Sequence, residues 1–121
     1  MSKTVLTVDD SRTMRDMLLL ALQDAGYTVI QAVDGVDGLE TLAARGADVV
    51  ITDINMPRMD GFGFIEGMRA DPNHRTTPVL VLTTESDAEK KARARAAGAT
   101  GWIVKPFDPA KLVDAVRRVA A

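Results

Sequence analysis

Residues 48–61 read DVVITDINMPRMDG. The run begins with four consecutive apolar or β-branched residues, at positions 49–52, and then reaches Asp53. An unbroken run of this kind is typical of a strand that is covered on both faces, as in a parallel sheet. Turn-forming pairs follow, Met56-Pro57 and Asp60-Gly61. The segment therefore predicts a buried strand that delivers a carboxylate to the edge of a sheet.

The same alternation of a short apolar run with a helical pattern extends along the whole chain. Strands are predicted at residues 4–8, 28–33, 48–53, 78–84 and 101–105, and helices at 11–26, 35–46, 62–72, 86–99 and 108–121. Ser86 with Glu89 predicts a capping box, and Asp108-Pro109 predicts another helix start. Met14, Met17 and Leu18 are among the residues predicted to face the core from the first helix. Five strand–helix repeats favour an α/β fold with a parallel sheet and helices on both faces. We expect one domain over residues 1–121, without a separate output domain.

Composition narrows the class of protein. The chain has 121 residues, of which 46% are hydrophobic and 26% charged, and no Cys, which excludes disulfides and thiol chemistry. The formal charge of -2 is uneven, because the first 61 residues carry five basic and ten acidic side chains and the remainder ten and seven. Neither half is basic enough to predict nucleic-acid binding. The N-terminus becomes charged too early for a signal peptide and the apolar runs are too short to span a bilayer, so we expect a cytoplasmic protein.

Reactive side chains stand at the ends of four of the five predicted strands. The first ends on Asp9 and Asp10, the third on Asp53, the fourth on Thr83 with Thr84, and the fifth on Lys105. In open parallel α/β sheets, ligands bind outside the carboxyl ends of the strands. The topology therefore predicts that three carboxylates, a hydroxyl and an ammonium group share one rim.

Each residue has a plainer interpretation when taken alone. Asp10 or Ser11 could cap a helix, Asp53 could begin an Asx-turn, and Lys105 could be a solvated charge. Thr83 could be an ordinary strand residue. Three acids at one edge, however, raise one another's pKa unless a cation compensates, so a dedicated site accounts for the arrangement better than separate accidents. The Asp34-Gly35 pair after the second strand is interpreted as a plain turn.

Oxygen donors at this rim suit Mg²⁺, which binds one or two carboxylates together with phosphate oxygens. Asp9, Asp10 and Asp53 can supply carboxylates, and the backbone carbonyl of Asn55 another oxygen. A transition-metal site is disfavoured, because the only histidine, His74, lies in a predicted loop, where we expect it to be solvated. A carboxylate beside Mg²⁺ and a lysine can accept a phosphoryl group as an aspartyl phosphate.

Four segments together resemble one known family: VDDSRTMR (8–15), ITDINMPRMDG (51–61), LTTES (82–86) and WIVKPF (102–107). They resemble the receiver domain of bacterial two-component response regulators, most closely the single-domain chemotaxis type, over essentially the whole chain. The resemblance implies a flavodoxin-like fold with strand order 2-1-3-4-5. It also implies that Asp53 is the phosphoacceptor, that Asp9, Asp10, Asp53 and the Asn55 carbonyl hold Mg²⁺, and that Thr83 is the switch hydroxyl and Lys105 the phosphate-binding lysine.

Further roles come from the same resemblance. Trp102 stands at the position of the switch aromatic, the Lys105-Pro106 peptide bond is expected to be cis, and Asn55 and Glu85 occupy positions that tune dephosphorylation. Two positions depart from the family pattern. Trp102 replaces the commoner Tyr or Phe, and Thr84 replaces a small residue, and both bear on the strength of coupling.

Phosphorylation is expected to draw Thr83 toward the phosphoryl group and to let Trp102 turn inward. That would alter the face made by the fourth helix, the fifth strand and the fifth helix. This face carries basic side chains, which form either a solvated surface or a docking face for an acidic partner: Lys90, Lys91, Arg93, Arg95, Lys111, Arg117 and Arg118. The resemblance implies a histidine kinase and the flagellar motor switch as partners. We expect a monomeric signal transducer, not an enzyme, that binds neither nucleic acid nor membrane.

Two alternatives remain. The protein could be a phosphate sink that drains a kinase without an output target. It could also be a haloacid-dehalogenase-type phosphatase. That family carries the motif D-x-D-x-T, but here Asn55 stands in place of the second Asp, and its side chain cannot transfer a proton.

Overall fold

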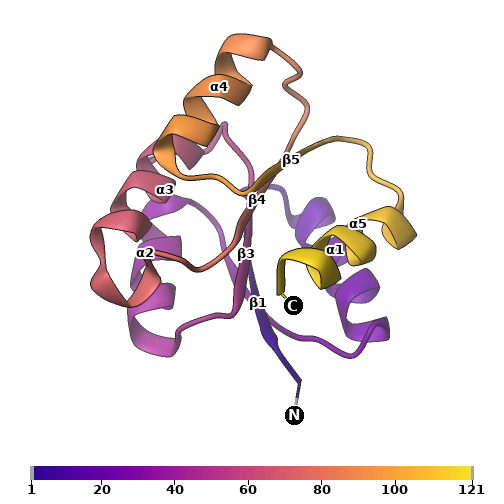
Figure 1. The fold of residues 1–121 in the computed structure, drawn as a ribbon. Helices are drawn as coiled ribbons and strands as arrows, with labels where there is room; N and C mark the ends of the chain where they lie inside the picture. The colour runs from indigo at the N-terminus through magenta and orange to yellow at the C-terminus, as the bar shows by residue number, and fades with distance from the viewer. Residues whose placement is uncertain (1, 121) are drawn as a thin grey trace.

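A five-stranded parallel sheet forms the centre of the structure, a computed structural model that describes residues 2–120 (Figure 1). The sheet order is β2-β1-β3-β4-β5, which confirms the predicted order and fold class. The elements in chain order are β1 (Thr4–Val8), α1 (Arg12–Asp24), β2 (Thr28–Ala32), α2 (Gly35–Arg45), β3 (Val49–Thr52), α3 (Gly61–Ala70), a 3₁₀ turn η1 (Pro72–His74), β4 (Val79–Thr83), α4 (Ala88–Ala97), β5 (Gly101–Val104) and α5 (Pro109–Ala120).

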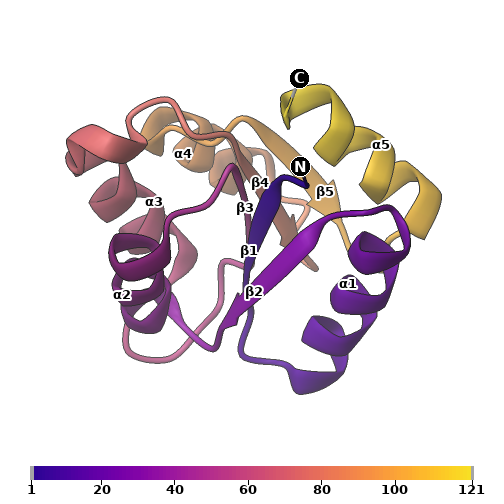
Figure 2. The same ribbon diagram turned by 90° about the horizontal axis from the view of Figure 1, so that it is seen from below.

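Helices cover both faces of the sheet. Figure 2 shows α1 and α5 on one face and α2, α3 and α4 on the other. Side chains alternate along β1, so that Leu6 packs in the core beneath α2–α4 and Val5 in the core beneath α1 and α5. Every residue of β3 and β4 is buried, as their unbroken apolar runs predict. Within residues 2–120, no helix is both long and apolar enough to cross a membrane.

Strand register places the reactive residues. Val8 pairs with Thr52 across β1 and β3, so the residues that follow them, Asp9 and Asp53, leave the sheet side by side. Thr83 pairs with Val104 across β4 and β5, which brings Lys105 to the same edge. The parallel sheet thus places the residues at the ends of different strands at one edge, where they can form one site.

Helix starts agree with the sequence in most places. Ser11 caps α1 by accepting the Met14 N–H at 3.2 Å, and Asp108 accepts the Ala110 N–H at 2.9 Å at the start of α5. The predicted Ser86 cap is wrong, because Asp87 lies directly before α4 in an extended conformation and accepts the Glu89 N–H.

The side chain of Met17 was predicted to face the core from the first helix, but this residue is 44% exposed, so that prediction is wrong.

His74 is buried, with 8% of its surface exposed, so the expectation of a solvated histidine is wrong. The 3₁₀ turn that begins at Pro72 folds the loop back onto the domain. The His74 Nδ1 lies 3.0 Å from the Thr77 hydroxyl, and the His74 carbonyl accepts a hydrogen bond from Arg69 at 2.7 Å. The local turn and these hydrogen bonds therefore account for the burial of His74.

The turn after β2 is not a plain one. Asp34 is buried, caps α2 by accepting the Asp37 N–H at 2.9 Å, and accepts two hydrogen bonds from Arg58 at 2.7 and 3.1 Å. Arg58 adopts the left-handed conformation, with φ of 64°. Beside it, the Gly35 N–H donates to the Met59 carbonyl at 3.1 Å, and a Cβ at Gly35 would lie 2.6 Å from that oxygen. The loop that follows Asp53 is thereby fastened to the start of α2.

The two sides of α1 provide a matched test of the core. Leu22 is fully buried, whereas Leu20 on the same helix is 66% exposed. We expect Leu22→Ala to lower the free energy of unfolding by about 2–5 kcal/mol, because it removes buried methylene groups and leaves a cavity. The same replacement at Leu20 should change it by less than about 1 kcal/mol. Urea unfolding followed by circular dichroism measures both, and equal losses would contradict the helix orientation.

The Asp34–Arg58 contact predicts a pH dependence. Hydrogen bonds from Arg58, then from the Asp37 amide, lower the pKa of Asp34. A carboxyl whose pKa is lower in the folded state contributes stability above its unfolded pKa and loses it as the pH falls through the folded pKa. Asp34→Asn should therefore lower the melting temperature at pH 7, and the difference from wild type should narrow in acid, below about pH 4.

The matched control for this measurement is Asp114→Asn, since Asp114 is exposed and its contacts with Arg118 and Arg117 are 3.4 and 3.9 Å long. Surface pairs of this kind contribute little. A melting-temperature difference for Asp34→Asn that stays constant down to acid pH would show that the Asp34 charge is not what stabilises the contact.

Candidate functional site

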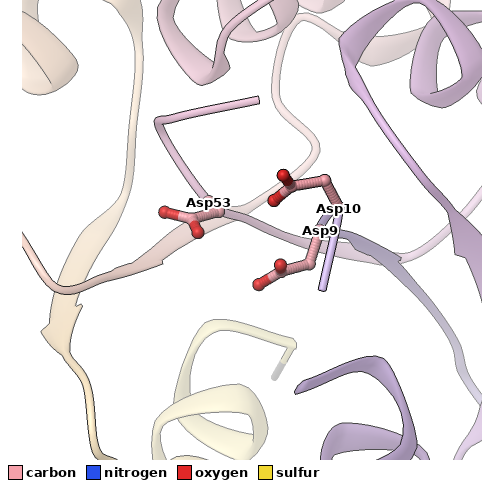
Figure 3. Close-up of side chains that lie close together, drawn as sticks. All are labelled: Asp9, Asp10 and Asp53. Carbon is pink, nitrogen blue, oxygen red and sulfur yellow. The ribbon is translucent and has the colours of Figure 1, made fainter. Parts of the chain in front are cut away.

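Three carboxylates meet at the carboxyl edge of the sheet. Asp9 and Asp10 extend from the end of β1, and Asp53 lies across from them at the end of β3 (Figure 3). One oxygen of each lies within 4.8 Å of the others. Asp9 is only 2% exposed, Asp53 is half-buried and Asp10 is exposed. The cluster thus has a buried inner side and a side open to solvent.

Lys105 joins two of these carboxylates. Its Nζ lies 2.9 Å from Asp9 Oδ2 and 2.9 Å from Asp53 Oδ2, and its side chain is 10% exposed. Burial raises the pKa of Asp9, although the Ser11 amide and Lys105 act in the opposite direction. Burial alone would lower the pKa of Lys105, but its hydrogen bonds to Asp53 and Asp9 outweigh that effect and raise it. The Lys105-Pro106 bond is cis, as the resemblance implies.

The turn after Asp53 holds its carboxylate in place. Asp53 Oδ1 accepts the Ile54 N–H at 2.7 Å, and the Gly61 N–H donates to the Ile54 carbonyl at 2.8 Å. A Cβ at Gly61 would collide with the backbone oxygen of Asp53, so the start of α3 approaches this turn as closely as only glycine permits. The other oxygen of Asp53, Oδ2, is the one that faces Lys105.

The donor set of the cluster suits a hard divalent cation. Asp9, Asp10 and Asp53 offer carboxylate oxygens from two adjacent strand ends, and carboxylates are the ligands that such cations prefer. Asp10 is exposed and accessible from solvent. The Asn55 backbone carbonyl, in the turn after Asp53, remains the predicted fourth oxygen. The arrangement could hold a cation directly beside the Asp53 side chain.

A second group of contacts surrounds Glu85, two residues beyond Thr83. Thr83 is fully buried, and its Oγ1 accepts the Glu85 N–H at 3.3 Å. The Glu85 carbonyl accepts the Trp102 Nε1–H at 3.1 Å, and its carboxylate accepts a hydrogen bond from the Asn55 amide at 3.1 Å. Hydrogen bonding from Asn55, then from Lys90, lowers the pKa of Glu85. Glu85 therefore links the predicted switch hydroxyl to the predicted switch aromatic.

Trp102 is half-buried and packs against the core that lies beneath α2–α4. It also lines a shallow groove between α4 and β5 with Lys91 and Arg95. Thr84, the other departure from the family pattern, is exposed. The indole thus touches the core, the Glu85 backbone and the surface at once.

The basic residues of the predicted partner face have different surroundings. Lys91 and Arg95 are one helical turn apart and share the groove with Trp102. Arg93 lies on another side of α4, over the Phe62 ring at 4.1 Å from its centroid, and does not line this groove. The remaining basic residues also differ: Lys90 pairs with Glu85, Lys111 is exposed, and Arg117 and Arg118 lie near Asp114.

Two contacts near the site were not predicted from the sequence. Arg58 reaches Asp34 over 24 residues, and Lys90 reaches Glu85 across the start of α4. An acid directly before Gly35 at a helix start is a capping signal that could have identified Asp34. Nothing in the spacing identifies Arg58 or Lys90 as the partner residues.

Comparison with known proteins agrees with this geometry. The family model of the response regulator receiver domain matches residues 5–117. Chemotaxis protein CheY-3 of Vibrio cholerae is 39% identical over 116 residues, covering 95% of this chain and 89% of that protein. A solved structure of Vibrio cholerae CheY4 has a TM-score of 0.94 at 46% identity and covers 98% of this chain and 99% of its own.

A more distant structure shares the fold. The receiver domain of sensor histidine kinase PA1611 from Pseudomonas aeruginosa, solved with a magnesium ion in its active site cleft, has a TM-score of 0.92 at 24% identity, covering 99% of this chain and 98% of its own. With a family match over most of its length and relatives well above 30% identity, the chain belongs to the receiver domain family of two-component response regulators.

Proposed function

We propose that this protein is a phosphorylation-activated signalling switch that takes a phosphoryl group from a chemotaxis-type histidine kinase onto Asp53. The observation that carries the proposal is the Lys105 ammonium group, 2.9 Å from both Asp9 and Asp53 within the carboxylate cluster. Membership of the receiver family and identity to CheY-3 support the kinase as donor and chemotaxis as the setting. The expected output is binding to a partner such as the flagellar motor switch.

Magnesium is the proposed cofactor. Asp9, Asp10 and Asp53 would hold it through carboxylate oxygens, and Asn55 through its backbone carbonyl, because this donor set consists only of hard oxygens. When bound, Mg²⁺ neutralises charge on the phosphoryl oxygens. The magnesium ion in the cleft of the PA1611 receiver is consistent with this assignment.

Phosphoryl transfer follows from the position of the Asp53 carboxylate. One of its oxygens attacks the phosphorus of a phosphohistidine, an O–P bond forms, and the P–N bond breaks with its electron pair left on the imidazole nitrogen. In dephosphorylation, which ends the signal, a water oxygen attacks phosphorus, the Asp53 O–P bond breaks, and inorganic phosphate leaves as a proton passes to solvent. Lys105 compensates negative charge in both steps. The protein changes only its own phosphorylation state and is not a turnover enzyme.

Signal transmission would pass through the Glu85 backbone. Thr83 Oγ1 accepts the Glu85 N–H, and its own hydroxyl proton can donate to a phosphoryl oxygen on Asp53. A shift of Thr83 toward that oxygen would pull on Glu85, whose carbonyl holds the Trp102 indole. Driving a two-state element from mostly off to mostly on takes about 5 kcal/mol. Two or three charge-assisted hydrogen bonds, each worth roughly 1.5–3 kcal/mol, are of the right size.

The groove beside Trp102 is the proposed output surface. Lys91 and Arg95 make it basic, which suits an acidic partner segment.

A phosphatase of the haloacid-dehalogenase type is disfavoured, because the side chain of Asn55 is an amide, which donates a hydrogen bond to Glu85. We propose a cytoplasmic monomer that uses neither nucleic acid nor membrane, and the phosphate sink remains the second candidate.

Phosphorylation at Asp53 is tested with acetyl phosphate and Mg²⁺. Intact-mass spectrometry should detect one phosphoryl adduct on the wild-type protein and none after Asp53→Asn, because the attacking oxygen is lost. Asp114→Asn, a replacement at an exposed aspartate on α5, should be labelled like wild type. Chelation of Mg²⁺ by EDTA should abolish labelling. An adduct that Asp53→Asn leaves undiminished would contradict the proposal.

Output is tested by binding of purified flagellar motor switch protein. The phosphorylated form should bind more tightly than the unphosphorylated form in a fluorescence titration of Trp102, the only tryptophan. Charge reversal at Lys91 and Arg95 should weaken binding by roughly tenfold through slower association. Arg93→Glu, on another side of the same helix, is the matched control. Absence of binding in both phosphorylation states would favour the phosphate sink.

A further inference from the structure

The Glu85 carboxylate contacts two side chains that come from different elements. Its Oε1 is 3.1 Å from the Asn55 amide nitrogen and 3.1 Å from the Lys90 ammonium nitrogen. The Glu85 side chain is 29% exposed and that of Lys90 is 40% exposed. A neutral donor and a cation therefore share one carboxylate oxygen at the edge of the site.

This contact spans the two loops that flank the proposed phosphoacceptor. Asn55 is two residues beyond Asp53, and Glu85 is two residues beyond Thr83, at the ends of the adjacent strands β3 and β4. Lys90 belongs to the first turn of α4 and closes the arrangement from a third element. The Asn55–Glu85–Lys90 contacts thus form a bridge, called here the rim bridge, across the outer side of the site.

The Glu85 carboxylate lies against the turn that follows Asp53, because the Asn55 side chain donates a hydrogen bond to it. A phosphoryl group on Asp53 would add negative charge to this part of the site and would repel Glu85 toward solvent. The Asn55 amide is neutral and offers only a hydrogen bond. Lys90 is the residue that supplies an opposite charge to this carboxylate.

We propose that Lys90 is a positioning residue, which holds the Glu85 carboxylate against Asn55 across the rim and thereby slows the approach of water to a phosphoryl group on Asp53. This inference rests on the proposed function. It separates Lys90 from Lys91, the neighbouring lysine that lines the groove beside Trp102. Both residues are lysines on α4, but only Lys90 belongs to the rim bridge, through its contact with the Glu85 carboxylate.

The test compares the lifetime of the phosphorylated protein. Wild type, Lys90→Met, Lys90→Arg and Arg118→Met are loaded with acetyl phosphate and Mg²⁺, freed of donor, and followed by intact mass as the adduct decays. Lys90→Met should lose the phosphoryl group roughly two- to fivefold faster, the size expected for one partly exposed ion pair. Lys90→Arg keeps the charge and should remain near wild type. Arg118→Met, which removes a cation that pairs with Asp114 on α5, should also remain near wild type.

Salt separates this role from a merely structural one. Because the Glu85–Lys90 pair is partly exposed, raising the ionic strength should weaken it and accelerate decay in wild type and Arg118→Met. Lys90→Met has no pair left to screen, so its decay should respond little. A further readout needs neither metal nor phosphate: the Asn55 side-chain amide resonances should shift in Lys90→Met and stay in place in Arg118→Met.

The outcomes are distinguishable. If no variant forms an adduct, the proposed function fails and this inference falls with it. If adducts form but decay at the same rate in wild type, Lys90→Met and Arg118→Met, only the inference is overturned. Equal salt responses in wild type and Lys90→Met would overturn it as well.

Discussion

The site depends on one electrostatic constraint, the neutralisation of clustered carboxylates by Lys105. Asp9 is almost fully buried with the oxygens of two further carboxylates within 4.8 Å, an arrangement that costs free energy unless a cation lies close by. Lys105 meets the requirement with one ammonium group that touches both Asp9 and Asp53. Because it comes from the end of β5 and they come from β1 and β3, the constraint joins distant parts of the sheet. The register between the strands therefore has an electrostatic consequence as well as a packing one.

The loop after β3 is held from two directions. On the β2 side, Arg58 binds Asp34, and on the β4 side Asn55 binds Glu85. Both contacts join this loop to a neighbouring one, and both donate a hydrogen bond to a partly or fully buried carboxylate, from a cation at Arg58 and from a neutral amide at Asn55. Asp53 lies at the start of that loop with both of its carboxylate oxygens in hydrogen bonds, an arrangement that suits the proposed in-line attack on phosphorus.

The sequence predicted the features that follow from periodicity and from parallel topology. Apolar runs identified the strands, and the rule that parallel strands end at one edge predicted that Asp9, Asp53 and Lys105 lie together. The strand order came from the resemblance. The Arg58–Asp34 contact could not be predicted, because pairing over 24 residues is decided by tertiary packing. The position of Arg93 over Phe62 agrees with helical periodicity, which places it on another side of α4 from Lys91 and Arg95.

In the proposed function, Glu85 connects chemistry and signalling within a single residue. Its backbone N–H binds Thr83, its carbonyl binds the Trp102 indole, and its carboxylate closes the rim with Asn55 and Lys90. Movement of its backbone would alter the output surface, and movement of its side chain would alter access to the phosphoryl group. A replacement at Glu85 that moved the backbone would disturb both functions together. Lys90 touches only the carboxylate, so under these proposals a replacement at Lys90 would change the lifetime of the phosphorylated state and leave the contacts from Thr83 to Trp102 intact.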